Sequence, residues 1–340
     1  MLNLLMNSEK NLQKGNFSRI YIEHDAFNYP DTRLVLDRFP KAERIPVEHY
    51  KQVLNRNNQN WRLQKENQAL ILAVRRDQFL YEGSDVAPDF GHQAFFYNTL
   101  VLNCLYDCSY CYLQGMYPSP HTVLFVNNED FIKHTAARVK QGPIYLCISY
   151  DTDLLAFEKL IPYSNRWIDV ARQHPDLTIE LRTKSSNYRA ISNQNPIDNF
   201  ILAWTLSPAF VARKYEQKTP GPELRLRAMK KAIRDGWKVR LCFDPLLYID
   251  DWQYHYRELV DQTFSEIAPE EVEDISIGVF RMSKQYLRRI RKQRQDTDVL
   301  LYPYEIEDGV ASYPGDVKSE MTRYVAECIA DYTSHEPVFI

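Results

Sequence analysis

The run Asn-Cys-Leu-Tyr-Asp-Cys-Ser-Tyr-Cys-Tyr-Leu-Gln at residues 103–114 places three of the chain's six cysteines within eight positions. These are Cys104, Cys108 and Cys111, so the spacing is C-x3-C-x2-C, and no fourth cysteine follows nearby. Structural zinc sites and ordinary electron-transfer clusters use four protein ligands. Three thiolates can instead hold three irons of a [4Fe–4S] cluster and leave the fourth iron open to a ligand that is not protein.

An open iron is what S-adenosylmethionine (SAM) needs in order to chelate a cluster and be cleaved by it. The aromatic residue before the third cysteine, Tyr110, is also typical of such motifs. The run resembles the cluster motif of the radical SAM superfamily. The sequence therefore predicts an enzyme with two cofactors, a [4Fe–4S] cluster and SAM.

Other interpretations of the cysteines were weighed against this one. A zinc site could be completed by a distant residue such as His121 or His92. Disulfides are disfavoured, because a chain of 340 residues can bury a core without them. The chain's start lacks a secretory signal, and no apolar stretch reaches the length of a membrane span. We expect a cytoplasmic protein with no membrane contact, since a reducing compartment suits an oxygen-sensitive cluster.

The composition says less about the class of protein than the cysteine motif does. The formal net charge is −3, so no global basic field points to nucleic acid. Glycine is scarce at 10 residues, whereas tyrosine (23) and phenylalanine (16) are plentiful. No internal repeat, low-complexity run or long linker is present, which favours one elaborated domain.

Apolar runs alternate with helical patterns after residue 93. The expected strands are Ala94–Asn103, Ile144–Ser149, Leu177–Arg182, Phe200–Leu206, Lys238–Phe243 and Asp274–Phe280. The expected helices are Asn128–Lys140, Ala156–His174, Pro222–Asp235, Asp251–Ile267 and Ser283–Arg294. Short apolar strands alternating with helices predict a parallel sheet covered on both faces. Six such units predict an α/β fold, a partial (βα)6 TIM-like barrel of the radical SAM type.

Three regions are expected along the chain. Residues 1–93 read as an N-terminal α/β elaboration packed on the barrel, and residues 94–299 as the barrel itself. Residues 300–340 are expected to form a hairpin and a closing helix near Val317–Thr333. The Asp308-Gly309 pair supplies the turn chemistry of that hairpin.

Polar or reactive residues follow the end of every predicted strand, where parallel barrels collect their functional groups. Cys147 is the most informative of them, although a lone cysteine on an apolar strand is by default a small core residue. Alternation places Tyr145, Cys147 and Ser149 on one face, and the polarity of Ser149 indicates that this face points into the barrel lumen. A thiol in that position could donate a hydrogen atom, because an S–H bond is weaker than most C–H bonds.

The chain resembles the spore photoproduct lyase family, radical SAM enzymes of DNA repair, over nearly its whole length. Cys-Ser-Tyr-Cys-Tyr-Leu-Gln at 108–114 is similar to the family's Cys-His-Tyr-Cys-Tyr-Leu-Gln. The matching segments that follow, in the family's order, are Cys147-Ile-Ser149, Thr183-Lys184, Trp204-Thr-Leu-Ser-Pro208, Glu216, Thr219-Pro220, Arg225-Leu-Arg-Ala228, Phe243-Asp-Pro245 and Trp252. Upstream, Ile22-Glu-His-Asp-Ala-Phe-Asn-Tyr-Pro30 and Arg38-Phe-Pro40 match as well.

This resemblance implies a mechanism and a role for each residue. SAM bound at the open iron is cleaved to a radical that abstracts hydrogen from C6 of 5-thyminyl-5,6-dihydrothymine (spore photoproduct), and the bridge between the thymines breaks. Cys147 returns a hydrogen atom, Tyr110 and Tyr112 relay the radical back so that SAM is regenerated, and Ser149 and Lys184 orient SAM. The implied partners are damaged DNA with the lesion flipped out, and an external one-electron donor such as a flavodoxin or ferredoxin.

Departures from the family pattern bear on the substrate more than on the chemistry. The family's C-terminal hairpin is basic, whereas here it reads Glu305-Ile-Glu-Asp-Gly-Val-Ala-Ser-Tyr-Pro314. A radical SAM enzyme acting on a different nucleotide, an RNA or a peptide therefore stays open. A zinc or Fe–S nucleic-acid-binding module is disfavoured, because it leaves Cys147, Lys184 and the barrel unexplained. The basic segments Arg225–Lys231 and Arg288–Arg294 are explained as well by solvated helix faces as by phosphate contacts.

Overall fold

The computed structural model describes residues 17–84, 87–295, 297–334, 336 and 338–339. Its largest element is an eight-stranded sheet with the order β18-β14-β13-β11-β10-β9-β5-β4. The six central strands run parallel: β5 (Phe95–Tyr97), β9 (Ile144–Cys147), β10 (Leu177–Thr183), β11 (Phe200–Thr205), β13 (Lys238–Leu246) and β14 (Asp274–Val279). At the edges, β4 (Tyr81–Glu82) is antiparallel to β5 and β18 (Val338–Phe339) is parallel to β14. Each of the six predicted strands contributes to this sheet.

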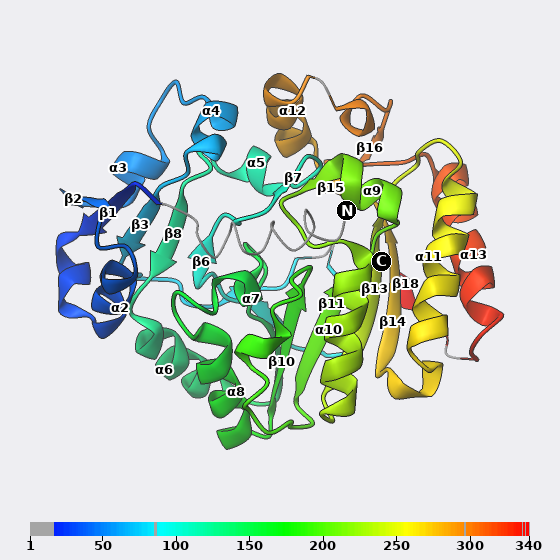
Figure 1. Cartoon of the computed structure of the whole chain (residues 1–340), viewed down its shortest axis with the longest axis horizontal. Coiled ribbons are helices and arrows are strands. Elements are labelled where there is room, and N and C mark those ends of the chain that lie inside the picture. The colour runs from blue at the N-terminus through cyan, green and yellow to red at the C-terminus, as the bar shows by residue number, and fades with distance from the viewer. Residues whose placement is uncertain (1–16, 85–86, 296, 335, 337, 340) are drawn as a thin grey trace.

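Helices cover the outer side of the curved sheet (Figure 1). They are α6 (Asn128–Val139), α7 (Leu154–Phe157), α8 (Tyr163–Gln173), α9 (Ala209–Tyr215), α10 (Pro222–Arg234), α11 (Trp252–Glu266) and α13 (Gly315–Ala330). Helix α12 (Lys284–Gln293) lies apart from them, at the top of the view in Figure 1. Short 3-10 helices lie in the loops: η1 (His24–Asn28), η2 (Tyr188–Ala190), η3 (Pro269–Glu271) and η4 (Asp298–Leu300). Every residue of β9 and β11 is buried, as a sheet covered on both faces requires. The predicted α/β fold with a partial (βα)6 barrel is confirmed.

A second sheet, with the order β2-β1-β3-β8-β6, lies beside the barrel. Its strands are β1 (Arg19–Glu23), β2 (Glu43–Val47), β3 (Leu70–Ala73), β6 (Val101–Leu102) and β8 (Thr122–Phe125). The helices of this region are α2 (Pro30–Arg38), α3 (Lys51–Leu54) and α4 (Trp61–Glu66). Strands β6 and β8 come from beyond residue 93, so this sheet extends past the predicted N-terminal region. The division of the chain at residues 93 and 299 stays a prediction.

Two expected elements are wrong in extent. The strand expected over Ala94–Asn103 is two strands, β5 in the barrel sheet and β6 in the second sheet. Between them the Asn98 N–H donates to Cys147 O at 3.2 Å, while Leu100 O accepts from Phe125 N at 3.1 Å. The chain therefore crosses from one sheet to the other within three residues. The helix expected over Ala156–His174 is split into α7 and α8, because Pro162 lacks the N–H that a continuous helix needs.

The C-terminal hairpin is confirmed. Strands β16 (Glu305–Glu307) and β17 (Val310–Ser312) pair antiparallel, and β15 (Arg281–Ser283) adds a third strand on the other side of β17. Asp308 and Gly309 both have positive φ, 48° and 81°, as a two-residue hairpin turn requires. Helix α13 then begins two residues earlier than predicted, at Gly315.

Candidate active site

A cavity of about 550 Å³ opens at the carboxyl ends of the barrel strands. All six parallel strands or the residues directly after them contribute to its wall: Tyr97, Cys147, Ser149, Arg182, Lys184, Thr205, Asp244, Phe280 and Arg281. Tyr145, Cys147 and Ser149 all line it, so the predicted lumen face of β9 is confirmed. The volume suits a cofactor together with part of a substrate.

The three motif cysteines lie in the loop between β6 and α5 (Leu113–Met116), beside this cavity. Cys108 and Cys111 line the cavity directly. Burial raises the pKa of all three thiols, and Cys111 adds to that rise for both Cys104 and Cys108. Three thiols on one loop, two of them lining the cavity, fit a cluster with one free iron.

A single metal ion does not fit the described residues as well. Among them no group of three or more His, Cys, Asp or Glu side chains could hold one ion. A cubane cluster binds each thiolate through a different iron, so this finding weighs against zinc and not against the cluster. His121 accepts the Ala69 N–H at 3.1 Å and His92 stacks on Tyr145 at 4.6 Å, so both histidines already have structural contacts.

Distant segments hold the cluster loop in shape. The Lys65 ammonium donates to Cys104 O at 2.6 Å, and Gln114 donates to Cys108 O at 2.7 Å. The short strand β7 (Asp107–Cys108) pairs with β12 (Glu216–Gln217), which follows the fourth barrel strand. Adding a Cβ to Gly115 of α5 would bring it within 2.5 Å of the Tyr286 backbone, so α12 packs directly on the loop. These contacts tie the cluster loop to α4, β12 and α12.

Cys147 is buried at the wall of the cavity, with 5% of its surface exposed. Its Sγ lies 3.9 Å from Glu180 Oε1 and 4.0 Å from Ser149 Oγ. Burial and the Glu180 carboxylate raise the pKa of Cys147 to about 12. The side chain is therefore a thiol at neutral pH, which is the form that can give up a hydrogen atom.

Lys184, directly after β10, also lines the cavity and already has an acidic neighbour. Its Nζ is 3.8 Å from Glu216 Oε1 and 5.8 Å from the centre of the Tyr110 ring. Glu216 also accepts hydrogen bonds from Tyr110, Arg225 and Ser207, the last at 2.8 Å. Burial opposes ionisation of Glu216, but Arg225 and Lys184 outweigh it and lower its pKa to about 2. Glu216 therefore anchors both a predicted relay tyrosine and the predicted SAM-binding lysine.

Tyr112 belongs to an aromatic group that the sequence did not predict. Its hydroxyl donates to the carbonyl of Tyr150, and the two rings lie 6.2 Å apart. Tyr150 stacks on Tyr97 at 4.2 Å, and Tyr97 stacks on Tyr81 at 5.0 Å. Tyr97, Tyr112 and Tyr150 all line the cavity. Strand alternation could have indicated Tyr97, but nothing in the sequence pairs it with Tyr150.

An ion network in the lumen was also missed. Glu180 binds Arg182 at 3.0 Å and also Arg240. Asp244 bridges Arg182 at 3.1 Å and Arg281 at 2.9 Å. The functional positions of Arg182, Asp244 and Arg281 can be predicted from their places at or after strand ends. Glu180 lies inside β10, before the strand end, and was not predicted.

Some arginines of the two basic segments have structural roles. Arg225 is fully buried against Glu216. In α12 and just after it, Arg289 donates to Gly115 O at 3.0 Å, and Arg294 pairs with Asp107, so both support the cluster loop. The remaining basic residues are mostly exposed, as solvated helix faces would be: Arg227, Lys231, Arg288 and Lys292.

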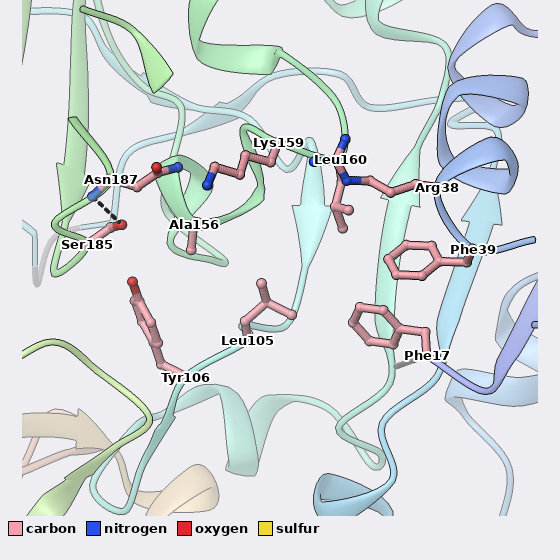
Figure 2. Close-up of a pocket in the computed structure, with 10 residues that line it drawn as sticks. All are labelled: Phe17, Arg38, Phe39, Leu105, Tyr106, Ala156, Lys159, Leu160, Ser185 and Asn187. Atoms are coloured by element: carbon pink, nitrogen blue, oxygen red, sulfur yellow. Dashed lines mark hydrogen bonds between the residues drawn. The ribbon is translucent and has the colours of Figure 1, made fainter. Parts of the chain in front are cut away.

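A separate hollow of about 50 Å³ is lined in part by the cluster loop (Figure 2). Leu105 and Tyr106 of the loop line it, together with Phe17 and Phe39 of the N-terminal region. Ser185 and Asn187 close one side through a hydrogen bond of 3.1 Å. Its volume is an order of magnitude below that of the lumen cavity, too small for SAM or a nucleotide.

A partial (βα)6 barrel with three cysteines of one loop at its mouth defines a radical SAM enzyme. Comparison with known proteins identifies the family within that class. The chain belongs to the spore photoproduct lyase family, whose family model, "Spore photoproduct lyase", matches residues 16–302. The chain is accordingly a radical SAM lyase with a [4Fe–4S] cluster and SAM as its cofactors.

Individual relatives are distant in sequence and close in fold. A spore photoproduct lyase of Geobacillus sp. (strain Y412MC61) is 20% identical over 278 residues, which cover 77% of each chain. A spore photoproduct lyase complexed with dinucleoside spore photoproduct is similar in structure, with a TM-score of 0.83 and 17% identity over 96% of this chain and 100% of that one. A double mutant with bound AdoMet and dinucleoside spore photoproduct has a TM-score of 0.81 and 17% identity over 95% and 97% of the chains.

Proposed function

We propose that this chain repairs spore photoproduct in DNA, converting 5-thyminyl-5,6-dihydrothymine to two thymines. The proposal rests on one observation above others: the Cys147 thiol shares a cavity with Cys108 and Cys111 of the cluster loop. Solved spore photoproduct lyases of the same fold bind the dinucleoside lesion and AdoMet. Membership of a family that carries out this repair supports the lesion as the substrate. The thiol that faces the cavity supports it as well.

Each residue of the cavity then has a part in the reaction. Cys104, Cys108 and Cys111 hold the cluster, and Lys184 and Ser149 bind SAM, the lysine through the SAM carboxylate. When bound, the cofactors would supply a 5′-deoxyadenosyl radical able to take hydrogen from C6 of the lesion.

After the bridge breaks, Cys147 gives its hydrogen atom to the thymine radical. Tyr110 and Tyr112 would then relay a hydrogen atom from 5′-deoxyadenosine to the Cys147 thiyl radical, which restores the thiol and passes the radical back to deoxyadenosine so that SAM can be regenerated. Tyr110 is held by Glu216 and Tyr112 by the carbonyl of Tyr150, so both rings are fixed beside the cavity.

Partners outside the cavity belong to the same proposal. The lesion must leave the duplex to reach the lumen, which requires base flipping. A one-electron donor such as a flavodoxin or ferredoxin reduces the cluster. No helix in the described part of the chain combines the length and apolarity needed to cross a bilayer. We place the protein in the cytoplasm, where reduced donors and DNA are available.

The test is anaerobic reconstitution with SAM, a reductant and dinucleotide spore photoproduct. Wild-type protein is expected to release thymine and to leave cyclobutane dimers unchanged, because they lack the methylene bridge. Cys147→Ala is expected to start the reaction but to give little thymine, to consume SAM and to accumulate adducts with the reductant. Cys242→Ala, a fully buried cysteine outside the cavity wall, is the control and should repair normally. Clean, full-yield thymine from Cys147→Ala would return Cys147 to a packing role.

The acidic hairpin favours a second candidate function, that of a radical SAM enzyme acting on another nucleotide, an RNA or a peptide. Glu305 and Glu307 of β16 are exposed, and the turn adds Asp308. Acidic side chains repel the phosphates of duplex DNA, so we expect weak duplex affinity with little effect on a dinucleotide substrate. Ready SAM cleavage with no turnover of either lesion would favour this second candidate.

A further inference from the structure

Glu180 is a buried carboxylate directly beside the Cys147 thiol. It faces Cys147 across the parallel pair β9–β10, and only 3% of its surface is exposed. Its Oε1 accepts from Arg182 Nε at 3.0 Å and lies 3.9 Å from Cys147 Sγ, within hydrogen-bond reach of a thiol. Its Oε2 accepts from the Tyr145 hydroxyl at 2.6 Å and from Arg240.

This surrounding keeps Glu180 ionised. Burial alone would raise the pKa of its carboxyl, but Arg182 and Arg240 outweigh burial and lower it to about 2. Each arginine also has another acid, Asp244 for Arg182 and Asp274 for Arg240. The negative charge next to the thiol is therefore permanent across the physiological pH range.

The charge state of Cys147 decides whether it can react as proposed. When a carbon radical takes hydrogen from a thiol, one S–H bond breaks and one C–H bond forms, leaving a neutral thiyl radical. A thiolate carries no hydrogen to give, and it could supply only an electron. Burial is the largest cause of the raised pKa of Cys147 and Glu180 adds to it, whereas Arg182, which also lies near this sulfur, favours the thiolate.

We propose that Glu180 is the positioning residue that keeps Cys147 protonated and directs its S–H bond, so that the hydrogen atom is available for transfer. This inference rests on the proposed role of Cys147. Glu180 itself neither gains nor loses a proton in the step. Besides Glu180 and Arg182, the groups near the sulfur are Tyr145 and Ser149 of the same strand segment and Tyr150 in the loop after it. Glu180 is the negatively charged group of this set.

The test measures the thiol directly in the reconstituted holoenzyme, without substrate. Iodoacetamide labelling of Cys147 is followed by peptide mass spectrometry between pH 7 and pH 10. Wild-type labelling is expected to stay slow throughout, because the pKa of Cys147 is about 12. Glu180→Gln keeps the shape but removes the charge, and labelling should accelerate about tenfold for each unit by which the pKa falls.

Asp274→Asn is the matched control, since it removes a carboxylate that binds the same Arg240 but does not contact Cys147. Its labelling profile should match that of the wild type. A Glu180→Gln profile equal to the wild type overturns the inference, and so does rapid wild-type labelling at pH 8. If Glu180→Gln does not fold, Glu180→Asp takes its place in the test. The shorter side chain keeps a negative charge for both arginines but moves it away from the sulfur. A labelling profile equal to that of the wild type would again overturn the inference.

Activity separates this inference from the proposed function. With the lesion present, the thymine yield of Glu180→Gln should fall as pH rises, and its SAM consumption should increase. The thymine yield of the wild type should fall less over the same pH range. Altered labelling in a protein that never repairs the lesion would refute the proposed function and leave the effect of Glu180 on the thiol intact. Unaltered labelling in a protein that repairs normally would refute only the role of Glu180.

Discussion

Removing the charge of Glu216 tests how the lysine side of the cavity is built. Glu216 and Arg225 form an ion pair in which both side chains are 0% exposed. Glu216→Leu leaves the guanidinium of Arg225 with only neutral partners, the carbonyls of Pro220 at 2.9 Å and Thr205 at 3.0 Å and the Thr219 hydroxyl at 3.0 Å. Arg225 cannot reach water without local unfolding.

The expected loss follows from that burial. Breaking a buried ion pair by removing one partner costs about 3–5 kcal/mol, because the remaining charge stays desolvated. This is a large share of the stability of a typical domain, about 5–15 kcal/mol. Lys184, the other cation beside Glu216, is 17% exposed in its side chain and can be hydrated, so it adds little to the loss.

Urea unfolding of the anaerobic protein, followed by circular dichroism, measures the difference. The control is the double variant Glu216→Leu with Arg225→Met, which removes both charges and should recover more than half of the loss. A loss of unfolding free energy below about 1 kcal/mol for Glu216→Leu would refute the reasoning, because a desolvated, unpaired guanidinium should destabilise the fold by more than that. A double variant no more stable than the single variant would refute it as well.

Three further outcomes are expected. Cys108→Ala should abolish reductive SAM cleavage, and 5′-deoxyadenosine from that reconstituted protein would disprove the cluster assignment. Lys184→Ala should weaken SAM binding in equilibrium dialysis more than Ser149→Ala does, with iron content unchanged in both, since a charge contributes more than a neutral hydrogen bond. Burial raises the pKa of Asp151 to about 7 from 3.8, and its Oδ1 has no hydrogen-bond partner among the described residues. The folded state therefore loses stability as pH rises from about 4 to 7, and urea titrations should show Asp151→Asn gaining on the wild type over that window and matching it below.

The barrel could be predicted from the sequence because its strands are short, continuous apolar runs separated by helices. Two errors in extent have local causes. The run at Ala94–Asn103 is apolar throughout, and periodicity does not reveal that β5 and β6 pair with different sheets. In Ala156–His174 the apolar pattern runs on across Pro162, but this proline lacks the N–H that a continuous helix needs, so α8 begins directly after it.

The site was predicted where motif and alternation agreed, and missed where contacts are long-range. Cys147 and Ser149 were placed on the lumen face by a period of two, and the structure confirms that placement. In the sequence, Glu180 is a polar residue inside a predicted strand, and nothing next to it indicates a functional role. Its partner Arg240 lies 60 residues away, and no local pattern links two charges at that separation.

The cluster loop is closed by parts of the chain that are made long after it. Arg294, which pairs with Asp107, follows it by 187 residues. At roughly 5–20 residues per second, a ribosome needs about 10–40 seconds to make that interval. During synthesis the three thiols therefore exist for that long without α12 packed over them. Iron delivery is best timed after this point, and a chain that stalls before residue 294 exposes unprotected thiols to oxidation.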